Sequence, residues 1–244
     1  MNLNKLFLTN NDCYKSGKKI TVKGIMVHST GANNPWLKRY LPDDGKIGKN
    51  QYGNHWNTAR PGGIQVCVHG FIGKLANGSV ATYQTLPWNH RGWHAGGSAN
   101  NTHIGFEICE DGLSDSTYFN AVYKEAVELC AYLCKEYGLT EKDIICHSEG
   151  YKKGVASNHG DVMHWFPKHG KSMDTFRSDV KKLLSGNTTT AAVTELTKVN
   201  DIVWELAHRG IISDSALWLK KLEEDANSYW LARKTANYLR NKNI

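Results

Sequence analysis

The 244-residue chain has no long apolar segment, because no stretch of roughly 18 consecutive apolar residues occurs in it. We therefore expect no membrane-spanning helix. The first ten residues contain one lysine and only a short apolar patch, which is not the composition of a secretory signal peptide. Together these absences predict synthesis in the cytoplasm without a signal peptide, so that any action outside the cell would follow release by another route.

The six cysteines form neither a CxxC pair nor the spacing of a disulfide framework. Most of them lie in apolar segments, and we interpret them as small buried hydrophobic residues. Cys130 and Cys134 are one helical turn apart, but a reducing compartment argues against a bond between them.

Basic residues are not clustered, although the formal net charge is +7. A basic protein suits an anionic polymer, such as nucleic acid or a cell wall that carries teichoic acid. The sequence has no Lys/Arg cluster and no motif that interleaves basic and aromatic residues. We therefore expect no nucleic-acid partner.

Apolar segments separated by polar, glycine-rich loops predict strands at 21–28, 64–72, 80–84, 103–109 and 143–147. Apolar residues at three- and four-residue spacing predict helices over 118–137 and 173–184, and a short helix is expected at 36–40. Residues 1–20 are polar and show no periodicity. These elements predict a main domain over residues 1–185.

The C-terminal part has a different composition. Residues 186–194 are rich in threonine and predict a linker, and residues 195–244 predict three short amphipathic helices. About fifty residues form only a marginal core, so we expect this small all-helical module to dock on a partner or to form a homodimer.

Two histidines follow predicted buried strands, which places each side chain at the end of a rigid element. His28 follows the apolar residues of the first strand, and His147 follows those of the last. Such a pair suits zinc, and Asp161, with His159 close to it, is a candidate third ligand. The alternative is that both histidines are hydrogen-bonded core residues.

Glu107 is the unusual residue of its strand, because a carboxylate in an apolar segment is costly unless it is paired or used in function. The segment that contains Trp93 and His94 is rich in aromatic residues and glycine. It is typical either of a wall that binds sugar or peptide or of a packed loop that supports a site.

Four motifs carry a family resemblance: Met26-Val27-His28-Ser29-Thr30, Trp93-His94-Ala95-Gly96, Ile104-Gly105-Phe106-Glu107 and Cys146-His147-Ser148-Glu149. In order and spacing they resemble the type-2 N-acetylmuramoyl-L-alanine amidases, which share their fold with the peptidoglycan recognition proteins. The resemblance covers roughly residues 20 to 185. It implies an α/β fold with a mixed central sheet flanked by helices, and a groove that holds one Zn2+ ion.

The resemblance also implies roles for single residues. His28, His147 and Asp161 would bind zinc, Glu107 would be the general base, and His159 or another nearby histidine would stabilise the oxyanion. Trp93 and His94 would face the substrate. The chain departs from the family pattern around the third ligand, where Val162 replaces a proline, His159 replaces a lysine and an insertion lies near 151–154. Asp161, His159 and His164 therefore all stay open as the third ligand.

The expected function is zinc-dependent cleavage of the amide between N-acetylmuramic acid and L-alanine in bacterial peptidoglycan. A C-terminal module after a linker is typical of a phage endolysin, and that module would bind wall polymers or pair two protomers. The alternatives are a non-catalytic peptidoglycan-binding protein and a cytoplasmic amidase that recycles muropeptides. The second alternative leaves the module unexplained.

Overall fold

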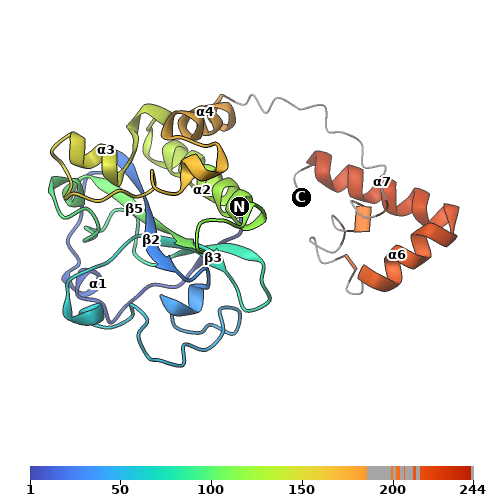
Figure 1. Cartoon of the computed structure of the whole chain (residues 1–244), viewed down its shortest axis with the longest axis horizontal. Coiled ribbons are helices and arrows are strands. Elements are labelled where there is room, and N and C mark those ends of the chain that lie inside the picture. The colour runs from blue at the N-terminus through green and yellow to red at the C-terminus, as the bar shows by residue number, and fades with distance from the viewer. Residues whose placement is uncertain (186–198, 200–201, 204–205, 207–210, 213–214, 243–244) are drawn as a thin grey trace. The chain divides into compact units, whose positions relative to one another are not determined.

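The computed structural model of this chain describes residues 1–185, 199, 202–203, 206, 211–212 and 215–242. The chain divides into two compact units, residues 1–186 and 187–244 (Figure 1). The linker expected at 186–194 lies outside the described residues. Within the described part of the chain, no helix combines the length and the apolar character that crossing a bilayer requires.

A six-stranded sheet forms the centre of the first unit, in the order β1-β4-β3-β5-β2-β6. Only β3 and β4 pair antiparallel, and every other neighbouring pair is parallel. The expected mixed sheet is therefore confirmed. The strands are β1 (Leu3–Lys5), β2 (Gly24–Asn33), β3 (Gly70–Lys74), β4 (Val80–Gln84), β5 (His103–Glu110) and β6 (Ile144–Cys146).

Two long helices cover one face of this sheet. Helix α2 (Ser116–Tyr137) is capped at its N-terminus by Asp115, whose side chain accepts hydrogen bonds from two backbone N–H groups. Gly138, in the left-handed conformation, caps its C-terminus. Helix α4 (Met173–Leu184) lies beside it, as Figure 1 shows. Apolar side chains of α2 pack with those of β2 and β5 in the largest core cluster, so the central strands are held on a rigid support.

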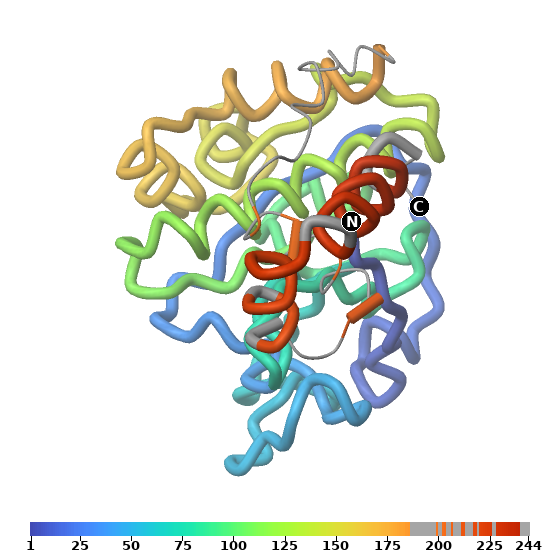
Figure 2. Tube along the Cα trace, turned by 90° about the vertical axis from the view of Figure 1, so that its right-hand side faces the viewer, coloured from blue at the N-terminus to red at the C-terminus, as the bar shows by residue number. Residues whose placement is uncertain are grey.

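A second apolar cluster lies under the loop that follows β2. It includes Leu37 from a 3-10 turn, the aromatic ring of Tyr40 and the side chain of Phe71 from β3. Tyr40 and Phe71 stack with their ring centroids 5.0 Å apart. In Figures 1 and 2 the loop around residue 50 lies on the opposite side of the first unit from α4.

Several predicted boundaries differ from the structure. The first predicted strand begins later, at Gly24, and continues to Asn33, whereas the strand expected at 64–72 begins only at Gly70. The N-terminal segment contains β1 and a short helix α1 (Asp12–Ser16), although no element was expected there. Strand β1 is three residues long and exists because it pairs with β4, so no local periodicity could reveal it.

The second unit contains helices α6 (Ser215–Glu224) and α7 (Ala226–Lys242). Their apolar residues Leu222 and Ala236 are buried in a small cluster with Ile202, Val203 and Leu206. Most of the helix that was expected after the linker lies outside the residues that the structure describes. Wall binding and dimerisation by this unit stay predictions.

Candidate metal centre

Three polar side chains meet at the carboxyl edge of the central parallel strands. His28 lies in β2, and β2 pairs with β6 so that Val27 is opposite Cys146. His147 follows Cys146 directly as the first residue of helix α3 (His147–Lys152). The parallel register therefore brings the two histidines to the same edge of the sheet, where their residues are 1% and 4% exposed.

Asp161 completes the group. Its Oδ2 atom lies 3.1 Å from Nδ1 of His28 and 3.6 Å from Nδ1 of His147, and the two Nδ1 atoms are 3.0 Å apart. One ligand atom from each residue lies within 4.8 Å of the others. Two imidazoles and one carboxylate that converge in this way form a donor set suited to a divalent metal.

The loop after α3 is fixed well enough to place Asp161. The backbone N–H of Ser148 donates to the Asp161 carbonyl at 3.1 Å, and the next residue, Val162, is fully buried in the main core. This anchoring lets a residue from a long polar loop meet His28, which lies within β2 and not at the strand end that the sequence predicted, and His147, which directly follows β6. The sequence motif alone left this position open.

Charge states at the centre suit metal binding. Burial raises the pKa of Asp161, but the neighbouring imidazoles of His28 and His147 outweigh it and hold that pKa below its usual value. Burial, with repulsion from His28, lowers the pKa of His147 to about 4. At neutral pH the carboxylate is therefore ionised, and His147 is neutral with one nitrogen lone pair available.

Glu107 lies opposite His28 in the register between β5 and β2. Its Oε2 atom is buried and has no hydrogen-bond partner in the described structure. Burial, with the charges of Asp161 and Glu110, raises the pKa of Glu107 well above its usual value. A carboxylate with a free oxygen and a raised pKa beside three convergent ligands has the properties of a general base.

The two other candidates for third ligand lie elsewhere. His159 is exposed, and its ring packs against that of His147 with the centroids 4.7 Å apart. His164 is turned away, because its Nε2 atom lies 2.9 Å from Oε1 of Glu110. Of the three candidates, Asp161 is the one that the structure brings to the two histidine ligands.

The side chains of Trp93 and His94 lie in different surroundings. Trp93 is 37% exposed, and the guanidinium of Arg91 lies over its ring at 4.6 Å. His94 lies against His28, with its Nδ1 atom 3.0 Å from Nε2 of that residue.

Sequence reasoning did not identify Ser157, whose hydroxyl lies 3.3 Å from Nε2 of His147. Nothing in a polar loop distinguishes one serine from its neighbours.

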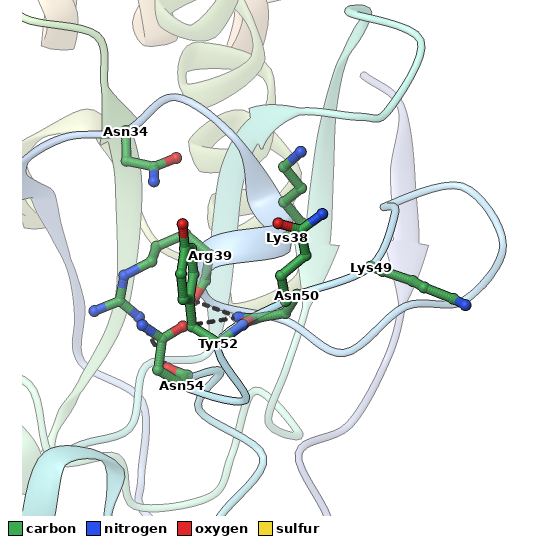
Figure 3. Close-up of a pocket in the computed structure, with 8 residues that line it drawn as sticks. Asn34, Lys38, Arg39, Lys49, Asn50, Tyr52 and Asn54 are labelled. Atoms are coloured by element: carbon green, nitrogen blue, oxygen red, sulfur yellow. Dashed lines mark hydrogen bonds between the residues drawn. The ribbon is translucent and has the colours of Figure 1, made fainter.

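A separate polar hollow lies in the loop after β2, with a volume of about 390 Å³ (Figure 3). Arg39 is held there by a 2.8 Å hydrogen bond to the carbonyl of Asn54. None of the lining residues is acidic, and none belongs to the metal centre: they are Asn34, Lys38, Arg39, Lys49, Asn50, Gln51, Tyr52 and Asn54. The hollow is therefore suited to anionic groups.

A mixed α/β sheet with a His-His-Asp group at its edge and a carboxylate beside it defines a candidate metal-dependent hydrolase. Residues 18–164 match the N-acetylmuramoyl-L-alanine amidase family, which is more than half of the chain. The chain belongs to this family, as its sequence motifs predicted.

Individual relatives support the assignment over part of their length. A protein of Bacillus licheniformis named a probable N-acetylmuramoyl-L-alanine amidase is 28% identical over 126 residues, which are 52% of this chain and 32% of that protein. The N-acetylmuramoyl-L-alanine amidase XlyA of Bacillus subtilis strain 168 is 38% identical over 68 residues, 27% of this chain and 22% of XlyA. The chain thus matches about a third or less of each curated relative.

Solved structures agree on the fold. The catalytic domain of XlyA aligns with a TM-score of 0.51 at 22% identity, covering 74% of this chain and 99% of that domain. The Staphylococcus aureus hydrolase AmiA in complex with its ligand aligns with the same TM-score at 18% identity, covering 75% and 82% of the two chains. At these identities the likeness establishes the fold.

Proposed function

We propose that this protein hydrolyses the amide bond between N-acetylmuramic acid and L-alanine in bacterial peptidoglycan, with one Zn2+ ion held by His28, His147 and Asp161. The observation that carries the proposal is the convergence of these three side chains within 4.8 Å beside Glu107. Membership of the amidase family supports this choice of bond.

The donor set fits zinc in particular. Two neutral imidazoles and one carboxylate are typical of a catalytic zinc site, in which three protein ligands leave a position open for water or substrate. When bound, the ion polarises the scissile carbonyl and lowers the pKa of water towards 7. The three side chains contribute position, because His28 lies within strand β2, His147 directly follows β6 and Asp161 lies in an anchored loop.

Glu107 then moves the proton. Its carboxylate takes the proton from the attacking water and delivers it to the nitrogen of the leaving amine. The raised pKa of Glu107 suits the first step, because a carboxylate whose pKa is raised by burial is a stronger base. His159, at the exposed rim beside His147, donates a hydrogen bond to the carbonyl oxygen as negative charge develops on it.

Substrate binding is proposed for Trp93, which is exposed at the rim, and for the basic hollow at Arg39. Peptidoglycan stem peptides carry carboxylates and wall teichoic acids carry phosphates, so a cationic surface attracts the polymer. His94, which was also expected to face the substrate, lies against His28.

We also propose the endolysin arrangement for the whole chain. Residues 1–185 would form the catalytic domain, 186–194 the linker and 195–244 a module that binds the wall or pairs two protomers, and the protein would act on the wall after release from the cytoplasm. The non-catalytic alternative is less well supported, because such proteins typically lack a zinc ligand, whereas this chain brings three suitable side chains together. A recycling amidase would act only on soluble muropeptides.

The test is hydrolysis of purified peptidoglycan with and without a chelator. We expect new L-alanine amino termini to appear, to cease after chelation and to return when zinc is added. Lack of any release by the zinc-loaded protein would refute the proposal. Release from soluble muropeptides with none from intact walls would favour the recycling enzyme.

A further inference from the structure

Both histidines of the metal centre have a second ring nitrogen that points away from it, and each of these nitrogens has a polar neighbour. Nε2 of His28 lies 3.0 Å from Nδ1 of His94. Nε2 of His147 lies 3.3 Å from Oγ of Ser157. What these neighbours donate or accept decides which nitrogen of each ligand carries the proton.

The proton on His94 can be placed from its other contact. Nε2 of His94 lies 3.2 Å from the backbone carbonyl oxygen of His103, and a carbonyl oxygen only accepts. Nε2 of His94 therefore carries the hydrogen. The ring contacts of His94 in the described structure are with His28, His69 and this carbonyl, and none of them is with a carboxylate. With its one hydrogen on Nε2, the ring has an acceptor at Nδ1.

The proton on His28 follows from that on His94. Since Nδ1 of His94 accepts, the hydrogen between the two rings belongs to Nε2 of His28. A neutral imidazole has only one such hydrogen. The Nδ1 atom of His28, which faces Asp161 and His147, is then left with its lone pair free for a metal.

The same reasoning applies to His147. The hydroxyl of Ser157 lies 3.3 Å from the backbone carbonyl oxygen of Ala95, so its hydrogen points there. Its oxygen is then free to accept from Nε2–H of His147. The Nδ1 atom of His147 again faces the centre with a free lone pair.

One short segment holds both supports. The backbone N–H groups of His94 and Ala95 donate to the same oxygen, Oδ1 of Asn100, at 2.8 and 2.9 Å, and Asn100 is 2% exposed. The backbone N–H of Ser157 donates to the Ala95 carbonyl at 2.8 Å. The same hydrogen-bonded segment therefore holds both His94 and Ser157 in place.

Glycine makes room for this arrangement. A Cβ atom on Gly105 would lie 2.3 Å from Nδ1 of His94, so that ring packs directly on the backbone of β5. A Cβ atom on Gly96 would lie 2.4 Å from Oγ of Ser157, and Gly96 has a positive φ of 61° as well. Two of the sequence motifs thus contain glycines that admit the groups behind the ligands.

We propose that His94 and Ser157 are positioning residues that hold His28 and His147 as the Nε2–H tautomers and so direct both Nδ1 lone pairs at the metal position. The proposal rests on the metal site of the proposed function. Groups that orient a metal-binding histidine through its distant nitrogen typically change metal affinity 10- to 100-fold when they are removed.

The test uses the full-length zinc-loaded protein and two readouts that do not need turnover. Long-range 15N–1H NMR correlations of the histidine rings report which nitrogen is protonated, and competition with a chromophoric chelator gives the zinc dissociation constant. In the wild type we expect His28 and His147 as Nε2–H tautomers. His94→Leu and Ser157→Ala should each weaken zinc binding about 10- to 100-fold.

Matched variants separate positioning from packing. His94→Asn keeps an acceptor near the place of Nδ1 and should recover much of the lost affinity. His90→Leu removes another buried histidine a few residues away, which contacts neither ligand, and should bind zinc as the wild type does. Circular dichroism and thermal unfolding establish that each variant is folded.

Two results would overturn the inference: Nδ1–H tautomers in the wild type, or unchanged zinc affinity in folded His94→Leu and Ser157→Ala. If His94→Leu does not fold, the tautomers of the wild type and the zinc affinity of Ser157→Ala still test the inference. The proposed function is tested separately. It fails if the zinc-loaded wild type releases no L-alanine amino termini from peptidoglycan, whichever tautomers the histidines have.

Discussion

His28 and Glu107 are direct partners across the parallel pair of β2 and β5. Side chains opposite each other on neighbouring strands point to the same face of a sheet. A proposed metal ligand and a carboxylate whose Oε2 atom has no hydrogen-bond partner in the described structure are therefore held side by side by backbone pairing. The register fixes their separation before any ligand is bound.

Glu107→Gln should abolish turnover and keep the metal. The amide preserves the shape of the side chain but cannot accept a proton, so we expect a rate loss of roughly 10²- to 10⁴-fold. Zinc content, measured by atomic spectroscopy, should stay at the wild-type value, because Glu107 is not among the three convergent ligands. A variant with wild-type activity would mean that another group acts as the base.

Asp161→Ala should lose zinc, whereas His159→Ala and His164→Ala should keep it. The reason is geometric, since the Asp161 carboxylate faces both Nδ1 atoms and His164 is paired with Glu110. Metal content of the three purified variants measures this directly. Zinc retained by Asp161→Ala and lost from His159→Ala would transfer the third ligand to His159.

Acid should destabilise the apo protein through His69. This side chain is fully buried, and burial lowers its pKa to about 4, whereas an unfolded histidine titrates near 6.5. Between these values the unfolded state binds more protons, so the free energy of unfolding falls as pH drops from about 6.5 towards 4. The full effect is on the order of 3 kcal/mol.

The comparison variant is His69→Gln, which has no titrating ring. Urea unfolding at pH 7.5 and pH 5, with chelator present, should show that the stability advantage of the wild type over the variant shrinks at the lower pH. An advantage that grows on acidification would contradict a buried neutral His69.

Removal of residues 187–244 should leave a folded and active first unit. Residues 1–186 form a compact unit with its own large core around α2. We expect the thermal midpoint of this unit and hydrolysis of soluble muropeptides to stay close to those of the full chain. Clearing of whole cells should weaken, and full clearing by the truncated protein would remove the proposed wall-binding role of the second unit.

Local sequence was enough for the elements that depend on short-range periodicity. The predicted helix at 173–184 matches α4, and the strand at 80–84 matches β4, because apolar spacing there reflects one buried face. The two histidines next to apolar segments and the carboxylate within an apolar strand were also visible in the sequence, since such residues are costly to bury without a partner. The expected end of the first strand at His28 was wrong, because β2 continues to Asn33.

Only the tertiary structure decided the rest. Strand β1 exists through its pairing with β4, and Asp161 reaches His28 from 133 positions away through a loop anchored in the core. The proton positions on His28 and His147 depend on His94 and Ser157, which lie in other segments. The amino-acid sequence by itself determined which chemical groups were available. Long-range strand pairing and hydrogen bonds decided where each group points, because both depend on contacts between residues far apart in the chain.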